Sequence, residues 1–261
     1  MFEKILITDK LELKKHKKEI IKLFHKSFNA ELDEKLWEWA YIENPCGDPV
    51  VSLYYHEGAL VGHYAVIPVR LKYNGTGILA ALSMTTMVDV SYRRHGLFIE
   101  QANVVYEEAK KLNYSLVYGF PNMNSAPGFK KRLGWTIDTQ GCVVELTSDK
   151  LPRESSKKSK NQIEFSLDDE LMLNWRLSKP GMKYIKDGNV IYKEFENEHD
   201  LIFHDNYFDS LDKNRKYNLY VSDCNDYDNE KSFDYAFGYK IFDEHMSGCN
   251  FKVDLIMSDV F

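Results

Sequence analysis

Cysteine is scarce in this chain, and no two cysteines lie close together in the sequence. The four residues, Cys46, Cys142, Cys224 and Cys249, form no Cys-x-x-Cys pair. A zinc site needs closely spaced thiolate or imidazole ligands, and a disulfide framework needs cysteine at higher density. We therefore expect no metal site, no disulfide framework and a reduced, cytoplasmic protein.

Long apolar runs and an excess of positive charge are absent as well. No run approaches the roughly 20 apolar residues that a membrane-spanning helix needs, and the first residues have no signal-peptide character. The formal net charge is −6, whereas nucleic-acid-binding domains are usually basic. We expect neither a membrane nor a nucleic acid as a partner.

Aromatic residues are abundant. The 261 residues are 44% hydrophobic and 28% charged, which is ordinary for a globular protein, but they include 17 Tyr and 15 Phe. Aromatic side chains favour β-strands. The length allows one large domain or two small ones, each with its own core.

Apolar periodicity in the first half predicts strands and helices in a mixed order, as an α/β fold with a mixed sheet requires. A hairpin turn is predicted at Asn74-Gly75, and Asp33 is a helix N-cap candidate. The predicted strands cover 2–8, 50–56, 60–73, 78–90 and 116–120, with two more between 135 and 147. The predicted helices cover 14–28, a segment that begins at Asp33, 97–112 and 125–133.

One connection in this order has the chemistry of an anion site. The strand that ends near Val88 is followed by a basic turn with Arg93, Arg94, His95 and Gly96, and the next helix begins at once. The first N–H groups of a helix lack intrahelical partners, and the helix dipole adds partial positive charge. A strand, a glycine turn and a helix N-terminus together favour binding of a phosphate.

This run resembles the pyrophosphate-binding motif of the GNAT N-acetyltransferase superfamily, with Val88, Tyr92, Arg93 and Gly96 in register. The segment from Asn122 to the Gly134-Trp135 pair resembles the next motif of that family. The resemblance covers about the first 147 residues and implies the GNAT fold. Two positions depart from the family pattern: Phe98 replaces a small residue, and Lys130 replaces a tyrosine that is catalytic in many members.

The resemblance implies acetyl-CoA or another acyl-CoA as co-substrate. It places the pyrophosphate over the N–H groups from Arg94 to Phe98, with the Arg93 and His95 side chains beside it. The residues implied to contact the coenzyme are Met87, Val88, Asp89, Arg93, Arg94, His95, Gly96, Leu97, Phe98, Asn122, Asn124 and Lys130. For Asn122 and Asn124 the alternative is a turn-stabilising role, and for Lys130 it is a place on a solvated helix face.

Direct attack of an amine on the thioester needs a proton acceptor. His63, within a predicted strand, is the first candidate base, because an ordinary histidine titrates at roughly pH 6 to 7. Asp89 is the second candidate, because it lies where the strand meets the coenzyme. The alternatives are a packed histidine in an aromatic strand and a turn-capping carboxylate.

The second half contains a weak echo of the first. Trp39 lies six residues before Pro45 and Trp175 five before Pro180, and strand patterns follow each. We predict a helix over 167–177 and strands over 183–186, 190–195 and 201–204. The predicted organisation is a GNAT domain over 1–147, a linker over 148–162 and a degenerate GNAT-like domain over 163–261. The alternative is an unrelated aromatic α+β extension.

The Ser83-Met84-Thr85-Thr86 run and the two-halved build resemble GNAT proteins of bacterial surface-polysaccharide synthesis. The resemblance implies N-acylation of a nucleotide-linked amino sugar. The alternatives are another small amine or a protein amine as acceptor, or a non-catalytic acyl-CoA-binding module. Aminoacyl transfer from a charged tRNA is disfavoured by the acidic balance and by the intact coenzyme turn.

Overall fold

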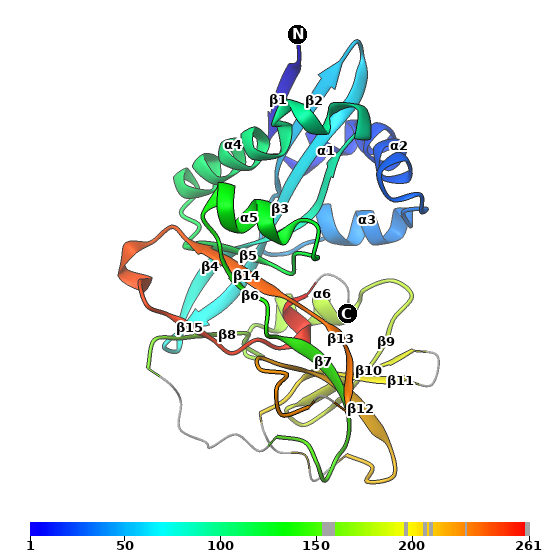
Figure 1. The fold of residues 1–261 in the computed structure, drawn as a ribbon, viewed down its shortest axis with the longest axis vertical. Helices are drawn as coiled ribbons and strands as arrows, with labels where there is room; N and C mark the ends of the chain where they lie inside the picture. Colours follow the sequence, from blue (N-terminus) through cyan, green and yellow to red (C-terminus); the bar gives the residue numbers. More distant parts are fainter. Residues whose placement is uncertain (153–159, 196–197, 206–207, 209–210, 228, 259–261) are drawn as a thin grey trace.

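Two mixed β-sheets form the framework of the protein, and helices cover the larger sheet (Figure 1). The computed structural model describes all residues except 153–159, 196–197, 206–207, 209–210, 228 and 259–261. The predicted α/β fold with mixed sheets is confirmed. Each helix and strand predicted in the first 147 residues is present, although the first predicted helix is divided into two and begins earlier.

The first sheet has the strand order β1-β2-β3-β4-β5-β14-β6. These strands are β1 (Glu3–Ile7), β2 (Val50–His56), β3 (Ala59–Tyr73), β4 (Thr76–Val88), β5 (Leu116–Gly119), β14 (Phe237–Ile241) and β6 (Thr136–Asp138). Short strands β8 (Gln162–Glu164) and β15 (Asn250–Phe251) extend it beside β3. On the main path β4 and β5 are parallel, and the other pairs are antiparallel.

Helices pack on both faces of this sheet. The helices are α1 (Lys10–Lys15), α2 (Lys17–Phe28), α3 (Glu34–Tyr41), α4 (Leu97–Lys111) and α5 (Ala126–Leu133). Alternation along β3 separates the faces: Tyr64 and Val66 pack with α4 and α5, whereas Ala65 and Ile67 pack with α2 and α3. The predicted cap is confirmed, since Asp33 accepts a hydrogen bond from the Lys35 N–H at 2.7 Å.

The second sheet has the order β13-β7-β12-β11-β10-β9. Its strands are β13 (Lys231–Asp234), β7 (Cys142–Thr147), β12 (Lys216–Val221), β11 (Glu198–Phe203), β10 (Val190–Phe195) and β9 (Lys183–Asp187). Here β11 and β12 are the parallel pair. The predicted second-half helix is α6 (Glu170–Leu177), and three short 3-10 helices are η1 (Val90–His95), η2 (Glu244–Met246) and η3 (Leu255–Met257).

On its main path the first sheet contains one strand from the second half of the chain, β14, and the second sheet contains one strand from the first half, β7. The consecutive strands β6 and β7 lie in different sheets, and so do β13 and β14. As a result, β14 lies between β5 and β6, and β7 lies between β12 and β13 (Figure 1). The two strands predicted between 135 and 147 are therefore confirmed as strands, but they do not pair with each other.

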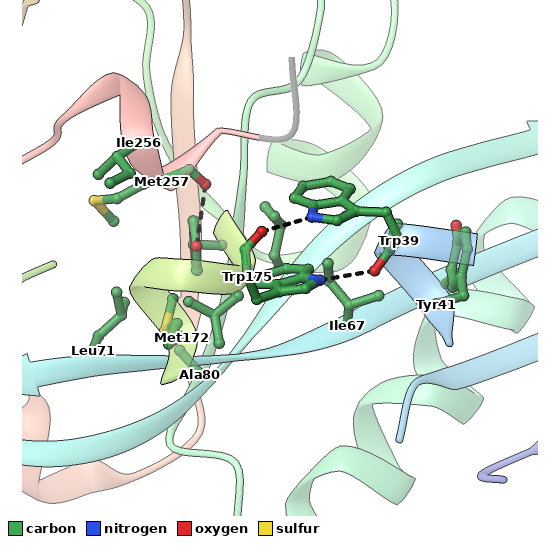
Figure 2. Close-up of a cluster of buried hydrophobic side chains, with 14 of the residues drawn as sticks. Trp39, Tyr41, Ile67, Leu71, Ala80, Met172, Trp175, Ile256 and Met257 are labelled. Carbon is green, nitrogen blue, oxygen red and sulfur yellow. Dashed lines mark hydrogen bonds between the residues drawn. The ribbon is translucent and has the colours of Figure 1, made fainter. Parts of the chain in front are cut away.

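The two halves also meet at a pair of tryptophans. Trp39 on α3 and Trp175 on α6 are buried and stacked, with ring centroids 4.6 Å apart and planes 11° from parallel. Figure 2 shows each indole N–H directed at the backbone carbonyl oxygen of the other residue. The residues that carried the sequence echo thus form one contact in the core.

Two further expectations bear on the connection between the halves. The expectation of no disulfide is wrong at one place: Cys142 on β7 and Cys224 after β12 are joined, with Cα atoms 6.0 Å apart. Cys46 and Cys249 are free. Of the predicted linker over 148–162, residues 153–159 lie outside the described residues. Ser148 and Leu151 are buried, and strand β8 begins at Gln162, the last residue of the predicted linker.

Candidate active site

The first sheet opens between its two parallel strands. The ladder between β4 and β5 consists of three pairs and ends at Leu82↔Tyr118, and β5 ends at Gly119. Strand β4 continues to Val88. On the side that faces β5, the backbone from Ser83 to Val88 therefore has no strand partner among the described residues. Such an edge can pair with an extended, amide-containing ligand as an added strand would.

A β-bulge lies in the same stretch of β4. The register with β3 shifts between His63↔Met87 and Ala65↔Met84, and Thr85 has a positive φ of 53°. Because the extra residue changes the alternation, Met84 and Met87 both pack against the core on the α2 and α3 side. The sequence analysis predicted a regular strand here, because nothing in Ser83-Met84-Thr85-Thr86 specifies a bulge.

The predicted anion turn follows directly. Helix η1 ends at Gly96, whose φ of 74° and ψ of 10° place it in the left-handed region, and α4 begins at Leu97. Glycine is the residue that adopts this conformation without strain. Among the described residues the N–H groups of Leu97 and Phe98 have no backbone partner, because the bonds to the Gly96 carbonyl begin at Ile99. These two donors lie at the positive end of a 15-residue helix.

The basic side chains of the turn contact its own backbone. The Arg93 guanidinium donates to the Val88 carbonyl at 3.3 Å, and His95 Nδ1 lies 3.2 Å from the Tyr92 carbonyl oxygen. Both side chains are exposed, and Arg94 is exposed too, with no hydrogen bond or ion pair to the described residues. Their charge surrounds the Gly96 turn, so the turn is suited to an anion.

Asp89 fixes the start of the turn. Its carboxylate accepts the Ser91 N–H at 3.0 Å and forms an ion pair with Lys26 at 2.5 Å, and the residue is 3% exposed. Burial by itself raises the pKa of Asp89, but the Lys26 ammonium and the Ser91 N–H outweigh it and hold the pKa below the ordinary value. A carboxylate of this kind is a weak proton acceptor. The contacts match the alternative role of a turn cap.

His63 lies on β3 opposite the bulge and is fully buried. Its Nδ1 is 2.8 Å from the Thr85 carbonyl oxygen, an acceptor, so Nδ1 carries the hydrogen and Nε2 holds the lone pair. Nε2 is buried and has no hydrogen-bond partner among the residues that the structure describes. Burial lowers the pKa of His63 to about 4, although the bond to Thr85 opposes the shift. The predicted ionisation between pH 6 and 7 is therefore wrong for this residue.

The other residues of the predicted site lie on both sides of the opening. Asn122 follows β5 and its side-chain oxygen accepts the N–H groups of Asn124 and Ser125 at 3.1 and 3.0 Å, which is the turn-stabilising role. Lys130 is exposed on α5. Phe98 lies between α4 and α5: its ring is 5.1 Å from the Phe129 ring. A Cβ added at Gly128 would lie 3.0 Å from the Phe98 ring, so the glycine makes room for the departure from the family pattern.

Two features beside the opening were missed by the sequence analysis. One is a chain of buried hydroxyl groups that ends at Ser83 and runs through Tyr64 and Tyr106. The other is an aromatic cluster in which Phe120, directly after β5, stacks on Tyr235 with centroids 4.9 Å apart. Tyr235 is far away in the sequence, and only the strand exchange brings it to β5, so no local pattern could have revealed this contact.

Comparisons with known proteins agree with this geometry. The family model "Acetyltransferase (GNAT) domain" matches residues 10–137. The chain contains a GNAT acetyltransferase domain. The protein is accordingly an N-acyltransferase of the GNAT type. None of the curated protein sequences compared with the chain matches it.

The fold likeness to solved structures extends over both halves. A conserved Enterococcus faecalis protein described as a probable N-acyltransferase is 12% identical, with a TM-score of 0.64 over 94% of this chain and 74% of its own. GCN5-related N-acetyltransferases from Kribbella flavida and Anabaena variabilis are 11% and 13% identical, both with a TM-score of 0.59. They cover 93% and 92% of this chain, and 72% and 73% of their own. At this identity the likeness concerns the fold.

Within the described residues, no helix has both the length and the apolar character needed to cross a membrane.

Proposed function

We propose that this GNAT-type enzyme transfers an acyl group from acyl-CoA to the amine of a nucleotide-linked amino sugar. The observation that carries the coenzyme part is the unpaired edge of β4 from Ser83 to Val88 next to the Gly96 turn. The pyrophosphate would lie on the Leu97 and Phe98 N–H groups, with Arg93, Arg94 and His95 around it. The pantetheine amides would pair with the free edge of β4.

Proton transfer in this proposal falls to His63 before Asp89. The imidazole is neutral at physiological pH and its Nε2 lone pair is unused, whereas Asp89 is engaged by Lys26 and Ser91. During the reaction the amine nitrogen bonds to the acyl carbon and loses a proton. The carbon–sulfur bond then breaks, and the coenzyme leaves as a thiol after gaining a proton. Lys130 occupies the position at which many family members carry a catalytic tyrosine. The proton that the thiolate gains then comes from Lys130 or from solvent.

A sugar acceptor is supported by the aromatic surface beside the opening. Phe120 and Tyr235 are partly buried and stacked, and Phe233 is 44% exposed with its ring 5.8 Å from that of Tyr235. Flat apolar faces of this kind stack on sugar rings and on nucleobases. The resemblance of the Ser83–Thr86 run to enzymes of polysaccharide synthesis points the same way.

We propose further that the second half is a degenerate GNAT-like repeat. In each half a helix capped by an aspartate, α3 or α6, precedes three antiparallel strands, β2–β4 or β9–β11. The third of these strands pairs in parallel with the next one, β5 or β12. On the other side of that strand, the sheet continues with a strand of the other half, β14 or β7. Polar side chains bridge the second parallel pair, β11 and β12. Asp200 on β11 accepts a hydrogen bond from Asn218 on β12 at 2.9 Å and forms an ion pair with Lys193 at 2.7 Å.

The carboxyl ends of that second pair do not suit a coenzyme. A cavity of about 340 Å³ there is lined by Asp223 and Asp254, and Lys252 lies 3.6 Å from Asp254. A phosphate would meet two carboxylates in this cavity instead of a basic glycine turn. This charge distribution supports a single coenzyme site per chain.

The proposal is tested in two steps. Acetyl-CoA should raise the melting temperature of the protein, because a ligand that binds only the folded state stabilises it. Mass spectrometry of mixtures with acetyl-CoA and one amine each should then detect acylation of UDP-linked amino sugars in preference to free amino sugars, polyamines and peptides. Absence of coenzyme binding would refute the whole proposal. Preferred acylation of a peptide or a polyamine would refute the acceptor class and keep the coenzyme site.

A further inference from the structure

A hydrogen-bonded chain of four side chains lies under α4 and α5 and ends at the opening of the sheet. Trp135 Nε1 donates to the Tyr106 hydroxyl at 2.9 Å, the Tyr106 and Tyr64 hydroxyls are 2.7 Å apart, and Tyr64 and Ser83 are 2.9 Å apart. Tyr64, Tyr106 and Trp135 are at most 3% exposed, whereas Ser83 is partly exposed. The chain therefore connects the protein core to the first unpaired residue of β4.

The direction of every hydrogen bond in this chain follows from its donors. An indole N–H can only donate, so Tyr106 accepts from Trp135. Among the described residues the buried Tyr106 hydrogen has one acceptor, the Tyr64 oxygen, so the arrangement that leaves no buried hydrogen unpaired has Tyr106 donating to Tyr64. Tyr64 then donates to Ser83 Oγ, whose own hydrogen has no acceptor among the described residues. The chain consequently presents one O–H donor, that of Ser83, at the opening.

The position of Ser83 relates this donor to the bound coenzyme. Ser83 is the next residue after Leu82, where the β4–β5 ladder ends, and Gly119 faces it: a Cβ on Gly119 would lie 3.1 Å from the Ser83 carbonyl oxygen. With the pyrophosphate at Gly96, an arm that follows β4 brings the acyl end of the coenzyme toward this point, where the strands rejoin.

We propose that the Ser83 hydroxyl is a catalytic residue that donates a hydrogen bond to the carbonyl oxygen of the bound thioester. The inference rests on the proposed acyl-CoA site. When the amine attacks, the nitrogen–carbon bond forms and the carbonyl π electrons move to the oxygen that Ser83 contacts. The C=O bond re-forms as the carbon–sulfur bond breaks and the thiolate leaves with that electron pair. The proton lost by the amine and the proton gained by sulfur balance, and Ser83 keeps its own. Tyr64 and Tyr106 are positioning residues.

The test compares two coenzymes that differ at the carbonyl group alone. Acetyl-CoA has the oxygen, and S-ethyl-CoA has the same length without it. Calorimetry on the full-length protein should find acetyl-CoA bound about three- to tenfold more tightly, the effect of one hydrogen bond. In Ser83→Ala the ratio of the two affinities should fall to about one. In Ser83→Thr, which keeps the hydroxyl, the ratio should be retained.

The outcomes separate this inference from the proposed function. If neither coenzyme binds, the acyl-CoA site itself is refuted. If both bind the unmutated protein equally, or if the preference for acetyl-CoA persists in Ser83→Ala, the Ser83 proposal is overturned and the coenzyme site stands. Tyr106→Phe tests the positioning role. It should lower the melting temperature, because Trp135 loses its acceptor, and it should reduce the affinity ratio, because Tyr64 is then free to accept the Ser83 hydrogen.

Discussion

Trp39 and Trp175 each donate an indole N–H to the backbone carbonyl oxygen of the other, at 2.8 Å in both directions (Figure 2). Each tryptophan lies six residues after the aspartate that caps its helix, Asp33 or Asp169. The two helices thus exchange identical hydrogen bonds from equivalent helix positions. The contact therefore joins the two halves of the chain through equivalent groups.

Removal of one of these bonds should destabilise the protein measurably. Trp175→Phe keeps most of the ring but loses the donor to Trp39, at an expected cost of about 1–2 kcal/mol in the free energy of unfolding. Urea denaturation followed by circular dichroism provides the measurement. Trp37→Phe is the matched control, since Trp37 is also buried in α3 but its N–H has no hydrogen-bond partner in the described part of the chain. Equal losses in the two variants would contradict a role for the reciprocal bonds.

The strand exchange predicts that the first half cannot form its sheet alone. A fragment that ends at Ser148 lacks β14, which leaves β6 without a neighbour and one edge of β5 open. We expect this fragment to be poorly soluble and to lack a cooperative thermal transition. A soluble fragment with full activity would refute the requirement for the second half.

A substitution in the intact chain tests the same exchange. In Gly238→Val the added Cβ would lie 2.4 Å from the Ile137 side chain and 3.0 Å from Trp135, so β14 could not pack beside β6. The expected loss is about 1–3 kcal/mol in the free energy of unfolding, measured by chemical denaturation. Gly77→Val is the control, because Gly77 lies in β4 with no atom within 4 Å of an added Cβ.

The anion turn gives a prediction about ligand binding. Gly96→Val should remove most of the thermal stabilisation by acetyl-CoA, because a β-branched side chain would hinder the close approach of the pyrophosphate to the backbone of the turn. The positive φ of Gly96 also strains any substitution. Gly248→Val controls for that strain, since Gly248 has a φ of 75° against 74° at Gly96 and has equally open surroundings. Coenzyme stabilisation that survives in Gly96→Val would exclude this turn as the pyrophosphate site.

His63 predicts how stability depends on pH. Its pKa of about 4 in the folded protein lies below the ordinary 6.5, so between these values the unfolded chain binds the extra proton. The stability contribution is complete above pH 6.5 and should decrease by about 3 kcal/mol as the pH falls to 4. His63→Leu lacks this ionisation, so denaturation experiments should find the variant gaining stability relative to the unmutated protein over that range. A constant difference would contradict the low pKa.

The same residue predicts the pH dependence of catalysis. If His63 is the base, its ionisation should make turnover increase as the pH is raised through about 4. The same ionisation should cause no further change in turnover between pH 6 and 7. His63→Gln should lower kcat by about a hundredfold and leave coenzyme affinity nearly unchanged. Asp89→Asn is the comparison. A loss in kcat confined to Asp89→Asn would transfer the role to the carboxylate, and no loss in either variant would leave deprotonation to water.

The disulfide between Cys142 and Cys224 holds the exchanged strand β7 to the segment after β12. It closes a long loop, so its loss should cost about 2–4 kcal/mol under oxidising conditions. Cys224→Ser should lower the melting temperature without reductant and have little effect when both proteins are reduced. Thiol titration of the unfolded, unreduced protein should count two thiols, those of Cys46 and Cys249; a count of four would contradict the bond.

Local signals along the chain determined the elements and the basic turn at Gly96. Apolar periodicity predicted the strands around Asn74-Gly75 and the helix after Gly96, because these features depend on neighbouring residues alone. The glycine requirement at position 96 is equally local, since it is a matter of backbone conformation. The motif resemblance then gave the GNAT fold, which the structure confirms.

Only the tertiary structure decided the contacts between distant segments. The exchange of β7 and β14 could not be predicted from the sequence of either strand. A short apolar strand can pair with any exposed sheet edge, and its own sequence does not specify which edge. The low pKa of His63 arises from burial, and the Ser83 donor depends on Tyr64, Tyr106 and Trp135, which come from β3, α4 and the segment between α5 and β6. The sequence by itself thus determined where the basic glycine turn lies, whereas protonation states and hydrogen-bond directions followed from packing between elements.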